Sequence, residues 1–458
     1  MRRPTQVLSL AVMAVLVLTL LPSYAQPKYP GTTLTLSIHA GHFAIPWQQR
    51  ASTIKQRFGI DIKVVGIDVS DMYKKQLLEL TSGTGAFDIL QYNPAWLGDY
   101  APYLQPLDEL MQKYPVDWED IVSGFRQWHS TFGGKIYGLV MDGDVLLMYY
   151  RKDLFDDAKN KAAFKQQFGY DLAPPQTWQQ LADVAKFFRN PEKNFYGYAD
   201  QLKRGRAFYW YLLRYFSYCG PNSQLFDPQT MKPRINDACA VQALSDMKDL
   251  VALQPPGVLN WEWDELFNAF MKGRVAVSIH WPDEGKRVAE LEKAVSGAKM
   301  GFAPIPGVKK GNTVVWRSTA AGGWLLGVTK ASKNVEAAWQ VVRFYESKEE
   351  SLKLVIDPNT GQDFFRTSHF ASPQVAKLAP PAYLRVYKQA IEAIYPELRI
   401  PSSFEYTDLL DRQIQLAFTG QLTAKAALDA AAAEWEKLTN ARGRNKQLAA
   451  YRAAMGIK

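Results

Sequence analysis

The sequence predicts an α/β protein of two lobes, and two observations support this prediction. The chain has 458 residues, whereas a single hydrophobic core stops growing at about 250–300 residues, so two domains are expected. The N-terminal part follows the order strand, helix, strand, helix, strand, which is typical of a mostly parallel sheet flanked by helices. The composition, 47% hydrophobic and 22% charged, is that of a globular protein.

The N-terminal segment has the pattern of a secretory signal peptide. Arg2 and Arg3 precede an apolar run over 7–21, and small residues lead to a cleavage site after Ala25. The apolar run, about 15 residues long, is too short to span a bilayer comfortably. An uncleaved anchor is the alternative. We expect a mature chain that starts after Ala25 and is located in the periplasm.

The charge of the chain gives no sign of a nucleic-acid partner. The formal net charge is +9, and it is +7 without Arg2 and Arg3, because residues 1–25 contain no acid. The basic residues are spread along the chain without a Lys/Arg block, which indicates a solvated basic surface.

Cys219 and Cys239 are the two cysteines of the chain. In an oxidising compartment such a pair indicates one disulfide. Two free buried thiols are the alternative. A metal site would need more ligands than this pair offers.

The first elements are readable from their periodicity. Strand patterns lie at 33–40, 61–65 and 87–91, and helix patterns lie at 47–58 and 71–80. Ligands of open parallel sheets bind beyond the carboxyl ends of the strands. This rule directs attention to the three segments that follow these strands, 42–47, 68–71 and 92–96.

Helix-start signals mark the middle and the C-terminal part. Thr177 and Gln180 form a capping box before a helix through Phe188. Ser372 precedes a first-turn proline, and Asn334 is a candidate cap for the helix that follows it. The C-terminal third is Ala-rich and predicted to be helical.

Six segments resemble, in the right order, motifs of the maltose-binding-like proteins, the extracellular solute-binding proteins of ABC sugar importers. The resemblance covers roughly Thr32 to Arg366, although Arg151 and Val277 replace the usual Asn and Met of two motifs. The six segments are Gly83–Ile89, Leu104–Asp108, Tyr137–Val140 with Leu147–Phe155, Pro175–Trp178, Phe270–Val277 and Gly322–Val328.

The resemblance implies the two-lobed periplasmic-binding-protein fold, with the ligand in a cleft that closes between the lobes. It places residues 26–140 with 279–326 in lobe I, and 141–278 with 327–458 in lobe II. The chain would cross between the lobes near 139–144, 275–280 and 324–330. The implied function is a monomeric binding protein, without enzymatic activity, cofactor or metal, that delivers a sugar or polyol to an ABC permease.

A sugar site needs aromatic rings for the C–H faces and polar groups for the hydroxyls. The chain supplies 13 Trp, 23 Tyr and 23 Phe. Position at strand ends, together with the resemblance, selects the candidates, although core packing is the alternative for any single Trp. The predicted ligand-binding residues are His42, Trp47, Asn93, Trp96, Asp142, Asp144, Trp210, Trp281, Asp283, Gly323, Trp324 and Arg366.

A carrier of an anionic solute is the second candidate function. Arg206, Arg317 and Arg366 are available to clamp a carboxylate or a phosphate. An ion-paired ligand would lose affinity as salt rises.

A glycan-acting enzyme is a third candidate. Asp142, Asp144 and Glu262 are acids that a glycosidase mechanism could use, since that chemistry needs two carboxyls facing one bond. No spacing demands this role, and no nucleophile elbow, P-loop or zinc motif is present.

A metal carrier is the fourth candidate. It would rest on the adjacent Tyr149 and Tyr150, or on His39 and His42. Strand alternation explains both pairs without a metal.

Overall fold

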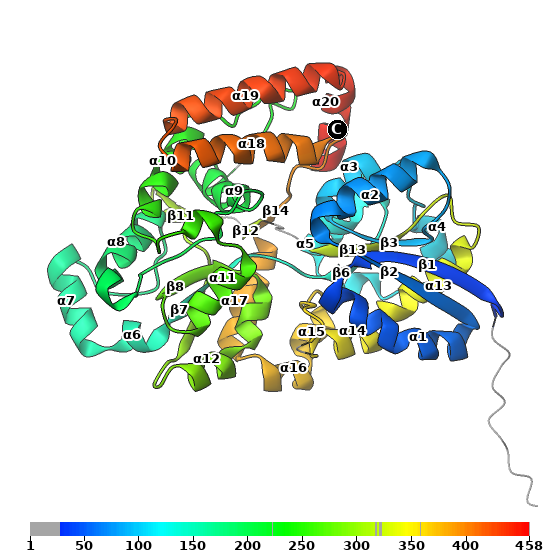
Figure 1. Ribbon diagram of the computed structural model, residues 1–458, viewed down its shortest axis with the longest axis horizontal. Helices are drawn as coiled ribbons and strands as arrows, with labels where there is room; N and C mark the ends of the chain where they lie inside the picture. Colours follow the sequence, from blue (N-terminus) through cyan, green and yellow to red (C-terminus); the bar gives the residue numbers. More distant parts are fainter. Residues whose placement is uncertain (1–27, 222, 317, 320–322, 358, 458) are drawn as a thin grey trace, which may run out of the picture.

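The molecule consists of two halves that lie side by side, with the C-terminal helices across one end (Figure 1). The computed structural model describes residues 28–221, 223–316, 318–319, 323–357 and 359–457. The predicted signal peptide, residues 1–25, lies outside the described residues, as do Arg317 and Gly322. Within the described ranges, no helix combines the length and the apolar character needed to cross a bilayer.

The first half is built on a five-stranded sheet of order β2-β1-β3-β13-β6. β1 runs parallel to β2 and β3, whereas β13 is antiparallel to β3 and β6. The three predicted N-terminal strands are confirmed. The strands are β1 (Thr32–His39), β2 (Ile60–Ile67), β3 (Ile89–Tyr92), β6 (Leu139–Asp142) and β13 (Trp324–Val328).

Helices cover this sheet, and local signals set their ends. The predicted helices are present as α1 and α2; Gly59, whose φ of 76° suits glycine, caps the C-terminal end of α1. The Asp68 carboxylate caps α2 by accepting from the Ser70 N–H at 2.9 Å. The helices of this half are α1 (Ala44–Phe58), α2 (Val69–Ser82), α3 (Leu97–Tyr100), α4 (Asp108–Lys113), α5 (Ser123–Phe125), α13 (Val335–Tyr345) and α14 (Lys348–Val355).

The second half contains a three-stranded sheet of order β8-β7-β9. β7 (Leu147–Arg151) is antiparallel to both β8 (Val277–His280) and β9 (Met300–Ala303). The expectation of a mostly parallel sheet in each lobe is therefore wrong for these three strands. The reason is that the chain enters the second half along β7, whereas β8 and β9 run in the opposite direction, toward the first half.

Ten helices described in this half surround the small sheet or pack on those that do. The predicted capping box of Thr177 and Gln180 is confirmed at the start of α8. The helices are α6 (Lys152–Asp156), α7 (Ala158–Phe168), α8 (Trp178–Phe188), α9 (Ala207–Tyr218), α10 (Ala238–Val251), α11 (Trp263–Met271), α12 (Val288–Ala294), α18 (Ser403–Phe418), α19 (Ala424–Ala441) and α20 (Arg444–Met455).

Short elements connect the two halves or extend their edges. The Ser372 hydroxyl caps α16 as predicted, whereas Asn334 occupies the cap position of α13 without a side-chain bond. The helices are α15 (Thr367–Ala371), α16 (Pro373–Leu378) and α17 (Pro381–Glu392), and the strands are β4 (Thr131–Phe132), β5 (Lys135–Ile136), β10 (Val308–Lys310), β11 (Thr313–Val315), β12 (Ser318–Thr319) and β14 (Ile394–Tyr395).

The chain crosses between the halves at places that differ from the expected ones. The first crossing, between β6 and β7, agrees closely with expectation. The crossing expected at 275–280 is wrong, because β8 and β9 belong to the same sheet. The chain returns between β9 and β13. No crossing lies at 324–330, because α13 packs against β13. Several segments therefore lie on the other side of the expected lobe boundaries: α12 and β9 lie in the second half, and α13 and α14 lie in the first.

The disulfide between Cys219 and Cys239 is present and joins the end of α9 to α10, with the Cα atoms 5.2 Å apart. Closing a loop of this length restricts the unfolded chain and contributes about 3 kcal/mol to stability. Replacing both cysteines by serine is therefore expected to lower the free energy of unfolding by about 3 kcal/mol, measured by denaturant titration. Reduction of the native protein should cause the same loss, and the double variant should not respond to reductant.

Candidate functional site

The first wall of the candidate site is an aromatic group at the carboxyl end of β1 and the start of β13. The Trp324 ring lies 6.0 Å from His39, 5.9 Å from Phe43 and 6.0 Å from Trp96, measured between ring centroids. His42 packs on Phe43 at 4.4 Å. His42 and Phe43 follow β1 and Trp96 follows β3, in two of the segments selected by the strand-end rule, whereas His39 ends β1 and Trp324 begins β13. That they form a ligand-binding wall stays a prediction.

The second wall comes from the other half and is formed by Trp281, Arg206 and Glu262. The Arg206 guanidinium lies 6.0 Å from the Trp281 ring, and its Nε lies 3.4 Å from Glu262. Lys203 also binds Glu262, at 2.6 Å. Trp281 follows β8 and packs edge-on against the buried Trp210 at 5.4 Å. The wall therefore offers an indole ring and a guanidinium held in place by a carboxylate.

Electrostatic interactions connect the two walls. The pKa of His39 is lowered to about 4 by burial, by His42 and by the positive charge of Arg206 from the opposite half. Burial and the charge of Arg287 lower the pKa of His42 in the same way. Both imidazoles are therefore neutral at pH 7, and each can donate one hydrogen bond and accept another. These interactions relate side chains of the two halves, so we take the region between them as the candidate site.

A group of carboxylates lies directly behind this site. Asp142 accepts from the Asp363 N–H at 2.6 Å, and Asp144 accepts from the Gly323 N–H at 2.9 Å. Single oxygens of Asp142, Asp144 and Asp363 lie within 4.8 Å of one another, a spacing compatible with a hard cation. Lys286 Nζ, however, lies 2.9 Å from Asp363 and already supplies positive charge. We assign no metal to this group.

The predicted ligand-binding residues fall into three sets. His42, Trp96, Trp281 and Trp324 line the two walls. Asn93, Gly323 and the predicted aspartates support them: Asn93 caps the turn that carries Trp96, and Gly323, with φ of 61°, would clash with His129 if it bore a Cβ. Their contact with a solute stays a prediction.

Three predicted residues have structural roles instead. Trp47 is fully buried and stacks on Tyr345 with ring centroids 3.8 Å apart, and Trp210 is buried behind Trp281. Arg366 is 1% exposed, and its guanidinium binds the Asp117 carbonyl, the Asp120 carboxylate, the Glu346 carbonyl and the Ser351 hydroxyl. The expected ligand contact of Arg366 is replaced by this internal role, because protein oxygens already occupy the guanidinium.

Sequence reasoning missed four members of the site and its support. His39, Arg206 and Glu262 had been considered only for the metal, anion or enzyme alternatives. Position at the end of a strand was a usable signal for His39. Arg206 and Glu262 carry no such signal, since they come together from separate loops. Lys286 was missed for the same reason.

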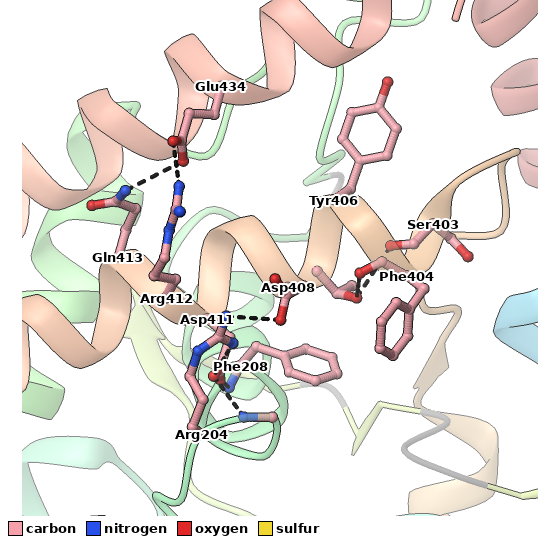
Figure 2. A network of polar contacts seen from close by, with 12 residues as sticks. Arg204, Phe208, Ser403, Phe404, Tyr406, Asp408, Asp411, Arg412, Gln413 and Glu434 are labelled. Atoms are coloured by element: carbon pink, nitrogen blue, oxygen red, sulfur yellow. Dashed lines mark hydrogen bonds and ion pairs between the residues drawn. The ribbon is translucent and has the colours of Figure 1, made fainter. Parts of the chain in front are cut away.

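The loop that carries Arg206 is fixed by α18 (Figure 2). The buried Asp411 carboxylate accepts from the backbone N–H groups of Gly205 and Phe208, at 2.7 and 2.9 Å, and from Arg204 at 2.9 Å. A carboxylate placed here satisfies N–H groups at the start of α9 and suits the positive end of the helix dipole. α18 therefore positions the second wall.

The N-terminal end of α18 also contacts the first half. The Asp99 carboxylate accepts from the Ser402 N–H at 3.0 Å. Phe404 stacks on Tyr73 of α2 with centroids 5.2 Å apart. The same helix thus contacts both halves.

Comparison with known proteins shows the family of the chain. The chain is 26% identical over 349 residues to a probable amino-acid ABC transporter periplasmic-binding protein of Sinorhizobium fredii, covering 74% of each chain. It is 23% identical over 422 residues to the mannitol-binding protein of Pseudomonas aeruginosa, covering 87% of this chain and 91% of the relative.

Among solved structures, an ABC transporter solute-binding protein from Agrobacterium radiobacter in complex with ribitol superposes with a TM-score of 0.75 and 24% identity, covering 90% of this chain and 100% of the other. At this identity the likeness shows the fold, which is the periplasmic-binding-protein fold. The profile of the family described as bacterial extracellular solute-binding protein matches residues 41–351. The chain therefore belongs to the bacterial extracellular solute-binding protein family.

Proposed function

We propose that the protein captures a small polyhydroxylated solute, a sugar or polyol, in the periplasm and delivers it to the permease of an ABC importer. The observation that carries the proposal is that Arg206, beside Trp281 in the second half, acts on His39, beside Trp324 in the first, which favours two indole rings facing one site. The C–H faces of a sugar or polyol pack on such rings, which provide large rigid area.

The polar groups of the site suit hydroxyls. Neutral His39 and His42 can each donate and accept, as a hydroxyl requires. Arg206 is held in place by Glu262 at 3.4 Å, so little side-chain freedom is lost when it binds a solute oxygen. The mannitol-binding relative and the ribitol-bound neighbour support a neutral polyol as the solute class.

The mechanism follows from the position of the walls in different halves. A solute that touches both walls gains its full interaction only when the halves are closed, so binding shifts the equilibrium toward the closed form. The permease would then recognise that closed form. A signal peptide cleaved after Ala25 would place the mature protein in the compartment where this delivery takes place.

An anionic solute is the second candidate, and one observation favours it. Arg206 and Arg287 both act on the histidines of the first wall, so two guanidinium groups lie close to the site. Bidentate binding of a carboxylate or phosphate is what guanidinium groups do well.

A thermal-shift screen tests the proposal. Mannitol, ribitol, hexoses, maltose, sugar phosphates, amino acids and other carboxylates are added separately to the purified mature protein. A solute at about 100 times its Kd stabilises the native state by about 2.7 kcal/mol, so Tm should rise for at least one sugar or polyol. Stabilisation only by acids, and its loss in high salt, would favour the anionic alternative. Stabilisation by amino acids alone would contradict both.

A further inference from the structure

Three buried carboxyl groups lie within 4.8 Å of one another where the two halves join, and a fourth acts on them electrostatically. Asp142 ends β6 of the first half, and Asp144 lies on the crossing to β7. Asp283 belongs to the 3₁₀ helix Pro282–Lys286, which follows β8 of the second half. Asp363 precedes α15 and binds Asp142 through its backbone N–H. We call these four residues the carboxyl cluster; its members come from both sides of the junction.

The carboxyl cluster has less positive charge than its acids require. Exposed fractions are 2% for Asp142, 1% for Asp363 and 8% for Asp144 and Asp283. Lys286 binds Asp363 and the Gln362 carbonyl. Arg287 also acts on Asp283, though more weakly than Lys286. Four ionised carboxylates this close would repel one another in a medium that screens charge poorly.

The other titratable groups around the cluster do not supply the missing charge. Tyr149 of β7, Tyr209 of α9, and Tyr383 and Tyr387 of α17 interact with it, and burial raises the pKa of each phenol, so all four are neutral.

Three further groups face the cluster. Burial raises the pKa of Glu284 and of Glu346 above the usual range. Beside Gly323, burial lowers the pKa of His129 to about 3, which leaves its imidazole neutral. None of these side chains contributes a positive charge.

We propose that closure of the two halves is linked to proton uptake by the carboxyl cluster. The closed form is therefore favoured in mildly acid solution, and its population falls as pH rises. The proposal rests on the proposed function in one respect: it assumes that the halves open and close. It adds a regulation of that movement by pH.

A small pocket reaches one member of the cluster, Asp283, and its counter-charge Lys286. This pocket of about 40 Å³ lies between the Pro282–Lys286 helix and the segment around Gly361, and both Asp283 and Lys286 line it. The pocket is bounded by elements of both halves, so opening would widen it and hydrate the carboxyl groups. Hydration favours the charged form of a carboxyl group.

The sign of the effect follows from the pKa values. In the packed arrangement burial raises the pKa of Asp363 to about 6 and raises those of Asp142 and Asp144 further above their usual range. In water an aspartate has a pKa of about 3.9. Between these values the closed form binds more protons than the open form. The closed-to-open ratio therefore falls as pH rises from about 4 through 6 and beyond, by about tenfold per pH unit for one linked proton.

The test measures the separation of the halves without any solute. Lys75 of α2 and Lys165 of α7 are exposed and lie on opposite halves (Figure 1), so each is replaced by cysteine and labelled for energy transfer in the oxidised protein. The mean distance is expected to increase between pH 5 and pH 8. In Asp142→Asn with Asp144→Asn, which keeps Lys286 and Asp363, this increase should be lost or strongly reduced.

Controls separate this linkage from general effects of pH. Asp88→Asn removes a buried acid that accepts from the Thr35 N–H and the Ser332 hydroxyl within the first half, and it should leave the increase unchanged. A label pair at Lys55 and Lys75, both in the first half, should not respond. A separation that does not depend on pH, or one that the double Asn variant retains in full, would overturn the linkage. If the separation responds to pH but to no solute of the screen, the proposed function fails and the linkage stands.

Discussion

Replacing Trp324 by alanine is expected to weaken solute binding by about 1–3 kcal/mol. The ring is the centre of the first wall, in contact with His39, Phe43 and Trp96, and its removal takes away the surface on which a sugar face packs. The affinity is measured by titration calorimetry with the solute that gives the largest thermal shift. Trp281→Ala should have an effect of the same size, because it removes the corresponding ring from the other wall.

Two matched variants make this prediction specific. Trp324→Phe keeps an aromatic face and should retain most of the affinity. Trp47→Phe alters a buried stack on Tyr345 away from both walls, so it should lower Tm without changing affinity. Equal affinity of the native protein and the two alanine variants would remove Trp324 and Trp281 from the binding surface.

Replacing Asp200 by alanine is expected to lower the free energy of unfolding by about 3–5 kcal/mol. Asp200 and Arg214 are an ion pair inside the second half, with side-chain exposures of 0% and 1%. The Asp200 carboxylate also accepts from Gln254 at 3.2 Å, and the Arg214 guanidinium lies 4.2 Å from the Trp178 ring. Without Asp200, the guanidinium stays buried without its counter-charge, which is the costly outcome.

Denaturant titration of Asp200→Ala checks this result, and a surface pair provides the control. Asp71 pairs with Lys75 on the exposed face of α2, where an ion pair contributes about 0–1 kcal/mol. Asp71→Ala should therefore change stability little. If Asp200→Ala also lost less than about 1 kcal/mol, the buried arginine would have to find another partner or water, and the ion pair would not be a main support of this half.

Local sequence signals predicted the elements well. The alternation of β1, the capping box of α8 and the strand ends that carry His42 and Trp96 are properties of neighbouring residues, and each was present where expected. The Cys219–Cys239 pair could also be predicted, because the chain contains no other cysteine.

Features that depend on distant contacts could not be predicted in the same way. Trp47 follows a strand as His42 and Trp96 do, yet Tyr345 of α13 packs on it and makes it a core residue. The predicted lobe boundaries were wrong at β9, which pairs with β7. The hydrophobic periodicity of a strand does not show which distant strand it pairs with. Lys286 and Asp363 come together only in the folded chain. The spacing of the acids along the sequence therefore could not predict the carboxyl cluster.

The anchoring of Arg206 by Asp411 has a consequence for how such a binding protein can diversify. Asp411 lies in α18, beyond residues 41–351 that match the family profile, yet it holds a loop that forms one wall of the site. Substitutions in this C-terminal segment can therefore change ligand preference even when the residues that contact the solute stay the same. Chimeras that exchange about the last 60 residues between relatives would alter selectivity, because this segment positions the loop that carries Arg206.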